Sequence, residues 1–378
     1  MLAKLSLICL ILGTGDAQFF GSRSPLPSLT KTANKLTNAA TNLPKTGINS
    51  LLSFNPLKLA EEALDNSWST FQGSFDKTYK TAEEAILRKE NFIENIGKIE
   101  NFNKIYSSGK YSFVQQINKF ADMLHHEFNS ILNGFGRFHA PRVPIQKSSS
   151  FIPSANVHIP DNIDWNEKGA VTPVKSQGLC GGCYAFSAAG AIEGHTYRKT
   201  GVLTELSPQN LIDCTDPYGN EGCVGGLMDP AFQYVKDNTG INSLVNYPYE
   251  AKNDTCRYKV QNPDAETTGF VTIPEGDENA LKIAVATLGP VSAAIDASQD
   301  TFQFYSSGVY FDEKCKNETM YMNHAILVVG YGVEQDGKEY WLVKNSYGPE
   351  WGIGGFFKLA RNANNHCGIA NIASFPLV

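Results

Sequence analysis

Three things are scarce in this chain of 378 residues, and each scarcity excludes a class of protein. Beyond the first 17 residues no apolar run is long enough to cross a bilayer. Basic side chains are in deficit: residues 159–378 hold 15 Lys and Arg against 26 Asp and Glu, which argues against nucleic acid as a partner. The pair Cys180 and Cys183 has no second C-x-x-C or C-x-x-H at zinc-finger spacing, so we expect no metal and no other cofactor.

The N-terminal segment predicts export. Residues 1–17 combine Lys4, the apolar run L-S-L-I-C-L-I-L and small residues before Gln18, which is typical of a cleaved signal peptide. Residues 18–60 are polar, rich in turn-forming residues and without a period, so we interpret them as a spacer, with a targeting role as the alternative. We therefore expect passage through the secretory pathway, to the lysosome or the cell exterior.

The cysteine count is odd once the signal peptide is removed. Of eight cysteines, Cys9 lies in the cleaved segment, which leaves seven. An exported protein with an odd cysteine either pairs between molecules or keeps a reactive thiol. The candidate for the free thiol is Cys183, although an inert core thiol is the common fate of a buried cysteine.

Cys183 lies in the run Q-G-L-C-G-G-C-Y-A-F-S, residues 177–187. The stretch that follows predicts a buried helix from about Cys183 to Lys199, closed by Gly201. Gly181 and Gly182 would allow a sharp turn into it. A thiol at a helix N-terminus, with an imidazole nearby, is in the setting that lowers a thiol pKa and makes it nucleophilic.

Two later segments offer a base and a residue that could orient it. His324 opens an apolar run that predicts a buried strand, and Asn345 ends a second such run. If the strands are neighbours, the Asn345 amide oxygen can accept from one imidazole nitrogen so that the other faces a thiol. A lone histidine at this place would otherwise be an ordinary core residue.

On these three motifs, in this order, the chain closely resembles the papain-like cysteine peptidases, and among them the cathepsin L-like group, over about residues 68–378. The resemblance implies an α+β fold of two lobes, mainly helical over about 159–270 and β-barrel-like over 271–378, with the cleft between them. It implies that this mature peptidase, residues 158–378, follows a helical inhibitory propeptide domain of residues 61–157. By the same resemblance Cys183 is the nucleophile, His324 the general base and acid, and Asn345 the residue that orients His324, while Gln177 and the Cys183 N–H form the oxyanion hole.

The resemblance also implies three disulfides, which leave Cys183 free: Cys180 with Cys223, Cys214 with Cys256, and Cys315 with Cys367. A redox role for Cys180 and Cys183 is the alternative that this pairing would exclude.

A substrate-binding set is implied in the same way. Backbone contacts to an extended peptide fall to Gly225, Gly226 and Asn323, and an apolar pocket to Leu227, Met228, Ala294, Met322 and Ile372. We expect Leu, Phe or Val two residues before the cut bond. There is no His-His pair between Cys223 and Cys256 to form an occluding loop, and no cysteine between Gln18 and His158, so we expect an endopeptidase. The expected partners are protein or peptide substrates, the chain's own propeptide and cystatin-like inhibitors, and a monomer is expected.

Two aromatic positions depart from the pattern of the family. Tyr184 and Tyr347 stand where tryptophan is usual. We expect Tyr347, in the substrate-binding set, to leave the bond between Asn345 and His324 more exposed to water and to change leaving-group preference. The competing hypothesis is a binding or storage protein that has lost catalysis.

The propeptide contains its own motif. Thr81 to Glu84 resembles a capping box, Glu84 and Arg88 are spaced to pair, and Ile86, Phe92, Ile96, Ile99 and Phe102 recur at helical spacing. The set Glu84, Arg88, Phe92, Asn95, Ile99 and Asn103 matches the signature of cathepsin L-like zymogens. A second signature is partial, with Asn118, Phe120 and Asp122 present and Gln116 in place of glycine. The following segment is expected to run backwards through the cleft, and the released propeptide could also inhibit related enzymes.

Charge predicts activation by acid. Residues 1–158 hold 17 basic against 12 acidic side chains, a net of +5, while residues 159–378 carry −11. Protonation of carboxylates near pH 4 would weaken this attraction. We expect cleavage within residues 148–158. The sequons at Asn253 and Asn317 are compatible with glycosylation.

Overall fold

The structure, a computed structural model, describes residues 56–136, 139–143, 148–154, 157–259 and 263–378. The expected signal peptide and almost all of the expected spacer lie outside the described residues. The chain divides into two compact units: residues up to Phe102 with Lys119–Met123, and Asn103–Asn118 with Leu124–Val378. Residues 124–136 and the described part of 139–157 thus group with the expected mature peptidase.

The first unit is built on two helices, α4 (Pro56–Ser74) and α5 (Ala82–Tyr106). Thr81 Oγ1 accepts from the Glu84 N–H at 3.1 Å, and the Glu84 carboxylate accepts from the Lys80 N–H at 2.9 Å, so a side-chain cap starts α5 as the sequence predicts. Glu84 and Arg88 approach to 4.0 Å. Aromatic rings join the helices, with Phe92 of α5 lying 4.6 Å from Phe71 of α4.

One residue of the predicted apolar stripe of α5 lies outside it. Phe92, Ile96, Ile99 and Phe102 are buried, whereas Ile86 is 61% exposed. At roughly 100° per residue, Ile86 points about 120° away from Phe92 around the helix axis. The prediction that Ile86 belongs to the buried face is therefore wrong.

A buried carboxylate ties the loop 119–123 to the rest of the first unit. Asp122, only 2% exposed, accepts from Lys77 Nζ at 2.8 Å and from Tyr79 Oη at 2.9 Å. Beside it, Asn95 of α5 donates to the carbonyls of Ala121 and Met123 at 2.9 and 3.0 Å. The loop is thus held by side-chain hydrogen bonds that satisfy its buried carbonyls.

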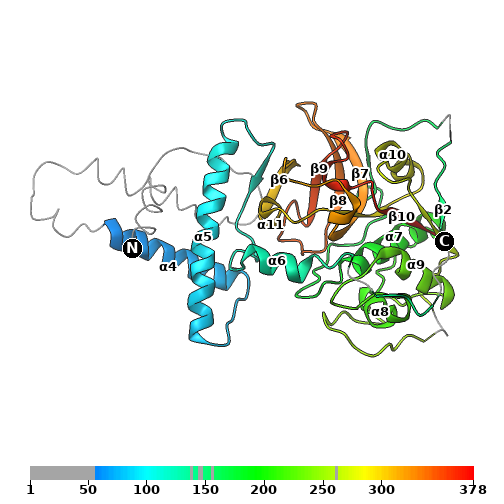
Figure 1. Ribbon diagram of the computed structural model, residues 1–378, viewed down its shortest axis with the longest axis horizontal. Helices are drawn as coiled ribbons and strands as arrows, with labels where there is room; N and C mark the ends of the chain where they lie inside the picture. The colour runs from blue at the N-terminus through cyan, green and yellow to red at the C-terminus, as the bar shows by residue number, and fades with distance from the viewer. Residues whose placement is uncertain (1–55, 137–138, 144–147, 155–156, 260–262) are drawn as a thin grey trace, which may run out of the picture. The chain divides into compact units, whose positions relative to one another are not determined.

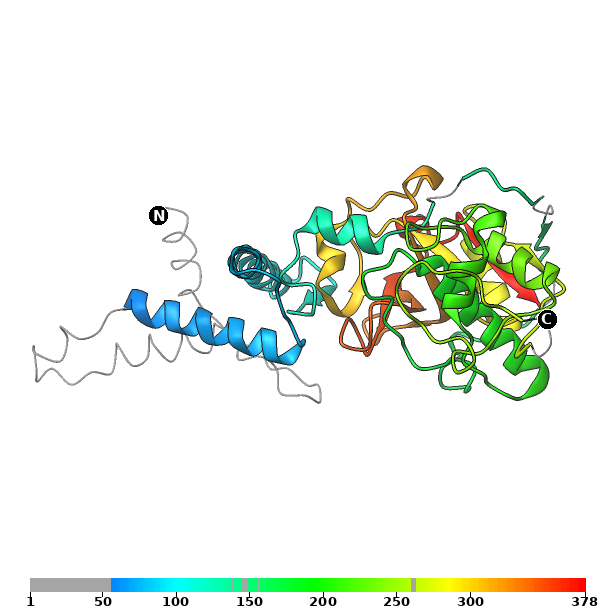
Figure 2. The same cartoon turned by 90° about the horizontal axis from the view of Figure 1, so that it is seen from below.

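The second unit places a helical lobe beside a sheet (Figure 1). Its longest helix is α7 (Cys183–Thr200), which ends at Gly201 with φ +77°, the left-handed cap that the sequence predicts. Alanine and glycine on α7 allow close packing against strand β7 (His324–Val333) and helix α9 (Met228–Asp237). Helix α6 (His125–Leu132) lies beside α11 (Asp300–Gln303) in both views (Figures 1 and 2).

The strands of this unit form a sheet in the order β1-β6-β9-β8-β7-β5-β10-β4-β2, with β3 paired to β7. At its centre β7 pairs antiparallel with β5 (Val291–Ile295) and with β8 (Glu339–Lys344), which pairs with β9 (Phe356–Ala360). The remaining elements are β1 (Phe113–Gln115), β2 (Ser149–Ser150), β3 (Ile163–Asp164), β4 (Gly269–Thr272), β6 (Tyr305–Tyr310), β10 (Ala373–Leu377), α8 (Pro208–Cys214), α10 (Glu278–Thr287) and 3-10 turns at Asp216–Tyr218, Thr319–Tyr321 and His366–Gly368.

Three disulfides link loops of the second unit: Cys180–Cys223, Cys214–Cys256 and Cys315–Cys367. These are the pairs that the resemblance implies, and Cys183 is a free cysteine. His366 lies close to the third pair, but both of its sulfurs are engaged in the disulfide. In the part of the chain that the structure describes, no helix is long and apolar enough to cross a membrane.

Replacement of Asp122 by alanine should destabilise the first unit, because Lys77 and Tyr79 would lose a buried partner. We expect the free energy of unfolding to fall by about 2–4 kcal/mol. The measurement is urea unfolding of the zymogen with Cys183→Ala as background, to prevent self-processing. The matched control is Asp65→Ala, which breaks the exposed pair with Lys89 and should cost less than about 1 kcal/mol. Equal losses in the two variants would contradict the role given to Asp122.

Candidate active site

The candidate nucleophile is the first residue of α7. Cys183 follows Gly182, the N-cap of the helix, and its side chain is completely buried. Gly182 has φ −79°, which any residue can adopt, so it is not needed for the sharp turn that the sequence suggests. Its lack of a side chain is needed, because a Cβ there would lie 2.8 Å from Ile212 Cδ1. One at Gly181 would lie 2.7 Å from the Cys223 carbonyl oxygen.

The environment of Cys183 acts on its pKa in two directions. Burial raises the pKa of the thiol, and this effect is the larger. The backbone N–H groups of Ala325, Gly134, Tyr184 and Cys183 itself lower the pKa, because each favours the thiolate. In this state of the protein, with the site closed to water, the neutral thiol is favoured.

The register of β7 and β8 brings His324 and Asn345 together. Leu327 pairs with Lys344, so Asn345 comes one step further along, diagonally opposite His324 at the start of β7. His324 Nε2 lies 2.8 Å from Asn345 Oδ1. The contact expected from two neighbouring strands is thus present.

A second hydrogen bond determines which imidazole nitrogen carries the proton. Asn345 Oδ1 also accepts from the Ser346 N–H at 2.8 Å, which identifies that amide atom as the oxygen because a backbone N–H can only donate. His324 Nε2 must therefore be the donor to Asn345. In the neutral ring Nδ1 is then a free base, and it is buried with no hydrogen-bond partner among the described residues.

Burial lowers the pKa of His324 to about 4, against the opposing effects of Asn345 and the Leu132 backbone. The imidazole is therefore neutral in this state at any pH well above 4. Together with the raised pKa of the thiol, this leaves an uncharged pair rather than a thiolate and an imidazolium.

Gln177 is held so that its amide N–H groups face the site. Its Oε1 accepts from Ser346 Oγ at 2.6 Å, which leaves Nε2 to donate to the Cys180 carbonyl at 2.8 Å and to the Leu132 carbonyl at 3.0 Å. The carbonyl of Leu132 thus accepts from the amide that the sequence resemblance expects to bind an oxyanion. Sequence reasoning identified Gln177 but missed Ser346, although Ser346 directly follows Asn345 in the same motif.

The segment Leu132–Gly136, here called the strand, begins with the last residue of α6 and runs along these residues, with one isolated β-bridge at Phe135. Gly226 donates to the Gly134 carbonyl at 3.0 Å and accepts from the Gly136 N–H at 3.3 Å. The Phe135 N–H donates to the Asn323 carbonyl at 3.0 Å, and the bridge between Phe135 and Gly226 is parallel. The segment therefore pairs with two of the residues expected to bind substrate backbone, and Phe135 is buried.

The expected pocket residues come from several elements of the second unit. Met228 begins α9, while the N–H of Ala294 on β5 donates to the Ile372 carbonyl at 2.9 Å. Met228, Ala294 and Met322 are buried, whereas Leu227 and Ile372 are partly exposed. Gly225 adopts φ +152°, so its backbone is one that other residues rarely take.

Tyr347 covers the imidazole. Its ring stacks on His324 at 4.7 Å with an interplanar angle of 27°, and its side chain is fully buried. Asn345 is 4% exposed, so its bond to His324 is buried in this closed state. The greater exposure to water expected with tyrosine in place of tryptophan stays a prediction for the mature enzyme.

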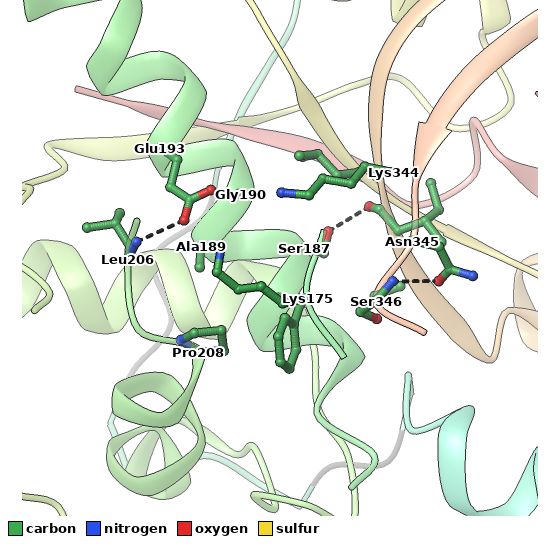
Figure 3. A pocket seen from close by; sticks show the side chains of 14 residues that line it. Lys175, Ser187, Ala189, Gly190, Glu193, Leu206, Pro208, Lys344, Asn345 and Ser346 are labelled. Carbon is green, nitrogen blue, oxygen red and sulfur yellow. Dashed lines mark hydrogen bonds between the residues drawn. The ribbon is translucent and has the colours of Figure 1, made fainter. Parts of the chain in front are cut away.

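Behind Asn345 lies a small cavity of about 30 Å³ between α7 and β8 (Figure 3). Lys344 and Glu193 point into it from the two elements, and Thr172 Oγ1 connects them, accepting from Lys344 Nζ at 3.0 Å and donating to Glu193 at 2.7 Å. Burial lowers the pKa of Lys344 to about 8, partly offset by the charge of Glu193. This buried polar cluster joins the two lobes directly behind the candidate site.

Comparison with known families gives two matches. Residues 159–377 match the papain family of cysteine proteases, and residues 68–128 match the cathepsin propeptide inhibitor domain I29.

Named relatives and solved structures agree with these matches. A cathepsin L-like peptidase of Aedes aegypti is 49% identical over 84% of this chain and 94% of its own, and procathepsin L of Felis catus is 46% identical over 84% and 93%. Digestive procathepsin L2 from the Tenebrio molitor larval midgut has a similar structure, with a TM-score of 0.77 and 39% identity over 83% of this chain and all of that one.

Replacement of Gly134 by alanine should displace the strand from the site. A Cβ there would lie 2.8 Å from Gly181 Cα and closer still to the Gly181 carbonyl oxygen, where backbone cannot give way. Such overpacking costs about 1–3 kcal/mol and favours displacement of the strand. We therefore expect Cys183 in the intact Gly134→Ala zymogen to be alkylated at least about tenfold faster at pH 7 than in the wild type. Mass spectrometry after brief iodoacetamide treatment measures this.

The control for Gly134→Ala is Gly73→Ala, because a Cβ at Gly73 in α4 meets nothing within 4 Å. The control should leave the alkylation rate of Cys183 unchanged. Equal rates in the wild type and the Gly134→Ala protein would contradict the close seating of this strand.

Proposed function

Because this chain belongs to the papain family of cysteine proteases and carries a cathepsin propeptide inhibitor domain, it is a cysteine peptidase made as a zymogen, and we propose that it is a cathepsin L-like endopeptidase with a Cys183–His324–Asn345 site. One observation carries the assignment of the site. Gln177 Nε2 donates to the carbonyl of Leu132, while the free thiol of Cys183 interacts with the backbone of Ala325, the residue that follows the oriented His324. A donor aimed at a carbonyl beside a nucleophile and a base is the arrangement that acyl transfer requires.

In the proposed reaction, His324 Nδ1 accepts the proton of the Cys183 thiol as the sulfur attacks the substrate carbonyl carbon. The carbonyl oxygen becomes an oxyanion, stabilised by Gln177 Nε2 and the Cys183 N–H. The C–N bond then breaks as His324 returns the proton to the leaving amine, which leaves a thioester. Water, deprotonated by His324, attacks the thioester, and the thiol is released with its proton as the acid product departs. Asn345 keeps Nε2 protonated throughout, so that Nδ1 remains the group that exchanges protons.

The strand Leu132–Gly136 accounts for the latency of the zymogen. It fills the hydrogen-bonding positions of Gly226, Asn323 and Gln177, and its parallel bridge to Gly226 is the reverse of the direction implied for a substrate in this family. A reversed strand can occupy the cleft without presenting a peptide bond in the geometry for attack. The inhibition is therefore competitive and intramolecular.

Specificity is proposed from the pocket residues. Leu227, Met228, Ala294, Met322 and Ile372 are all apolar, and the buried Phe135 lies at Gly226 and Asn323, next to this pocket. We assign this apolar pocket to the substrate residue two before the cut bond, and we expect Leu, Phe or Val to be preferred there. The boundaries of residues 61–157 for the propeptide and 158–378 for the mature peptidase are part of the same proposal.

The cellular setting is also a proposal. A signal peptide in residues 1–17 would lead the chain into the secretory pathway, towards the lysosome or the exterior, where disulfides persist. Asn253 and Asn317 would be the glycosylation sites, and the mature enzyme would act as a monomer open to cystatin-like inhibitors.

Acid activation has a physical cause in the site itself. In the closed state burial lowers the pKa of the His324 imidazole to about 4, although the Leu132 backbone acts in the opposite direction, whereas a histidine open to water titrates near 6.5. Between these values the open state binds more protons than the closed state. Each unit by which the pH falls within this range favours the open state by up to about tenfold. This effect adds to the weakening of the charge attraction between residues 1–158 and 159–378.

Self-processing should therefore accelerate as the pH falls from 6.5 towards 4, with cleavage within residues 148–158, of which 155–156 lie outside the described residues. Mass spectrometry after treatment with an epoxide selective for activated cysteines should find an adduct on Cys183 in a fragment starting near Ile159. Processing without an adduct would count against Cys183 and favour a binding protein that has lost catalysis.

His195→Gln is the control for the pH dependence. Burial lowers the pKa of His195 to about 4 as well, but this side chain hydrogen bonds to the Pro290 carbonyl, away from the strand. If loss of His195 shifted the pH midpoint of processing, the acid response would come from general destabilisation of the fold and not from His324.

Peptides that differ only two residues before the cut bond test the pocket. We expect kcat/KM of the mature enzyme to be at least about tenfold higher with Leu than with Arg, because Arg would bury a charge among apolar side chains without a partner. Ile372→Glu should bring the ratio towards one by supplying that partner. Val245→Glu, a change at an exposed position of the mature part, is the matched control. Equal cleavage of Leu and Arg peptides by the wild type would overturn the assignment.

A further inference from the structure

Tyr347 contacts the propeptide strand through its hydroxyl group. Its Oη donates to Asn133 Oδ1 at 2.9 Å, and both side chains are buried. The Asn133 amide nitrogen donates to the Ala297 carbonyl at 3.3 Å and to Asn129 Oδ1 at 2.9 Å. The carboxamide of Asn133 is thus matched at both ends, with a donor for its oxygen and acceptors for its nitrogen.

The position of Asn133 along the strand indicates which part of a substrate would make the same contact. Phe135 pairs with Gly226 at the pocket proposed for the residue two before the cut, and Gly134 passes against Gly181, beside Cys183. The next position in the same direction is Asn133, which lies beyond the nucleophile. The side chain of Asn133 therefore occupies the leaving-group side of the cleft, next to the position of the cut bond.

The two groups that hold this carboxamide on the enzyme side are rigid. The phenol ring is fixed by His324 at 4.7 Å, Trp351 at 5.3 Å and Phe302 at 6.4 Å. The backbone at Ala297 is held by its own N–H, which donates to Asn323 Oδ1 at 2.9 Å. All of these residues follow residue 158, so the donor and the acceptor remain when the propeptide leaves.

We propose that Tyr347 Oη and the Ala297 carbonyl form a carboxamide subsite, and that the mature enzyme prefers asparagine directly after the bond it cuts. The proposal rests on the proposed peptidase function and extends it to the leaving-group side. An asparagine side chain presents an acceptor and a donor at the spacing that Asn133 shows. The ring of Tyr347 supplies the hydroxyl donor, and the burial that raises the pKa of Tyr347 keeps this hydroxyl protonated over the working range.

The chemistry distinguishes asparagine from its nearest analogues. Leucine has a similar shape but leaves the Tyr347 hydroxyl and the Ala297 carbonyl without a partner. Aspartate offers oxygen at both ends, so one carboxylate oxygen faces the Ala297 carbonyl oxygen and repels it. One matched neutral hydrogen bond predicts a preference of roughly threefold to tenfold for asparagine over leucine.

Three quenched fluorescent peptides test the proposal, identical except for Asn, Leu or Asp directly after the cut bond, with the cleavage position verified by mass spectrometry. The acid-matured wild type should show a kcat/KM for Asn about three to ten times that for Leu, with Asp lower than both. In Tyr347→Phe the Asn-to-Leu ratio should fall to near one. In the control Tyr331→Phe, which removes a buried hydroxyl that bonds to the Pro160 carbonyl, the ratio should be kept.

The outcomes separate this inference from the proposed function. Cleavage of all three peptides by the wild type without preference for Asn would overturn the subsite alone, as would an unchanged ratio in Tyr347→Phe. Failure of the wild type to cleave any peptide would overturn the peptidase assignment and the subsite with it. The wild-type series decides the question by itself if Tyr347→Phe does not mature.

Discussion

The antiparallel pairing of β7 with β8 is the constraint on which the rest of the site depends. It places His324 at the beginning of one strand diagonally opposite Asn345 at the end of the next, and the Ser346 N–H then identifies the amide oxygen that the imidazole must face. A slip of one residue would turn His324 to the other face of the sheet and remove the base from the cleft. The buried length of β7 prevents such a slip, because nine of its ten residues would lose their packing.

Ser346 extends this constraint to a second functional group. Its hydroxyl holds Gln177 Oε1, so the strand that positions the imidazole also positions the amide that faces the Leu132 carbonyl. The buried cluster of Lys344, Thr172 and Glu193 ties the same strand end to α7, which carries Cys183. The proposed nucleophile, base and amide donor come from distant parts of the sequence, yet hydrogen bonds connect all three elements to the same end of β8.

Those features that depend on local pattern could be predicted from the sequence. Neighbouring residues are enough to predict the helix that begins at Cys183, its cap at Gly201 and the cap at Thr81. They also predict the strand that begins at His324 and the strand that ends before Asn345. Features that depend on close packing could not be predicted. They are the exposure of Ile86, the lack of space for a side chain at Gly182, and the close contact between Gly134 and Gly181. Asn133 carried no signal at all, because a polar residue at the end of a helix is usual and its partner Tyr347 lies more than 200 residues away.

Burial explains why the proposed catalytic groups can all be present in the zymogen and still be inactive. With the strand Leu132–Gly136 in place, burial raises the pKa of Cys183 and lowers the pKa of His324, so neither group carries the charge that attack requires. The same strand places a backbone carbonyl on the amide of Gln177 and a carboxamide on the hydroxyl of Tyr347. The groups of Gly226, Asn323, Gln177 and Tyr347 that are proposed to bind substrate polar atoms thus have partners in the closed state, and leaving one of them unpaired costs about 1–3 kcal/mol. Release of the strand must therefore be driven by an interaction that the open state makes and the closed state does not. Protonation of His324 is such an interaction, because the imidazole binds a proton only weakly while the strand is in place.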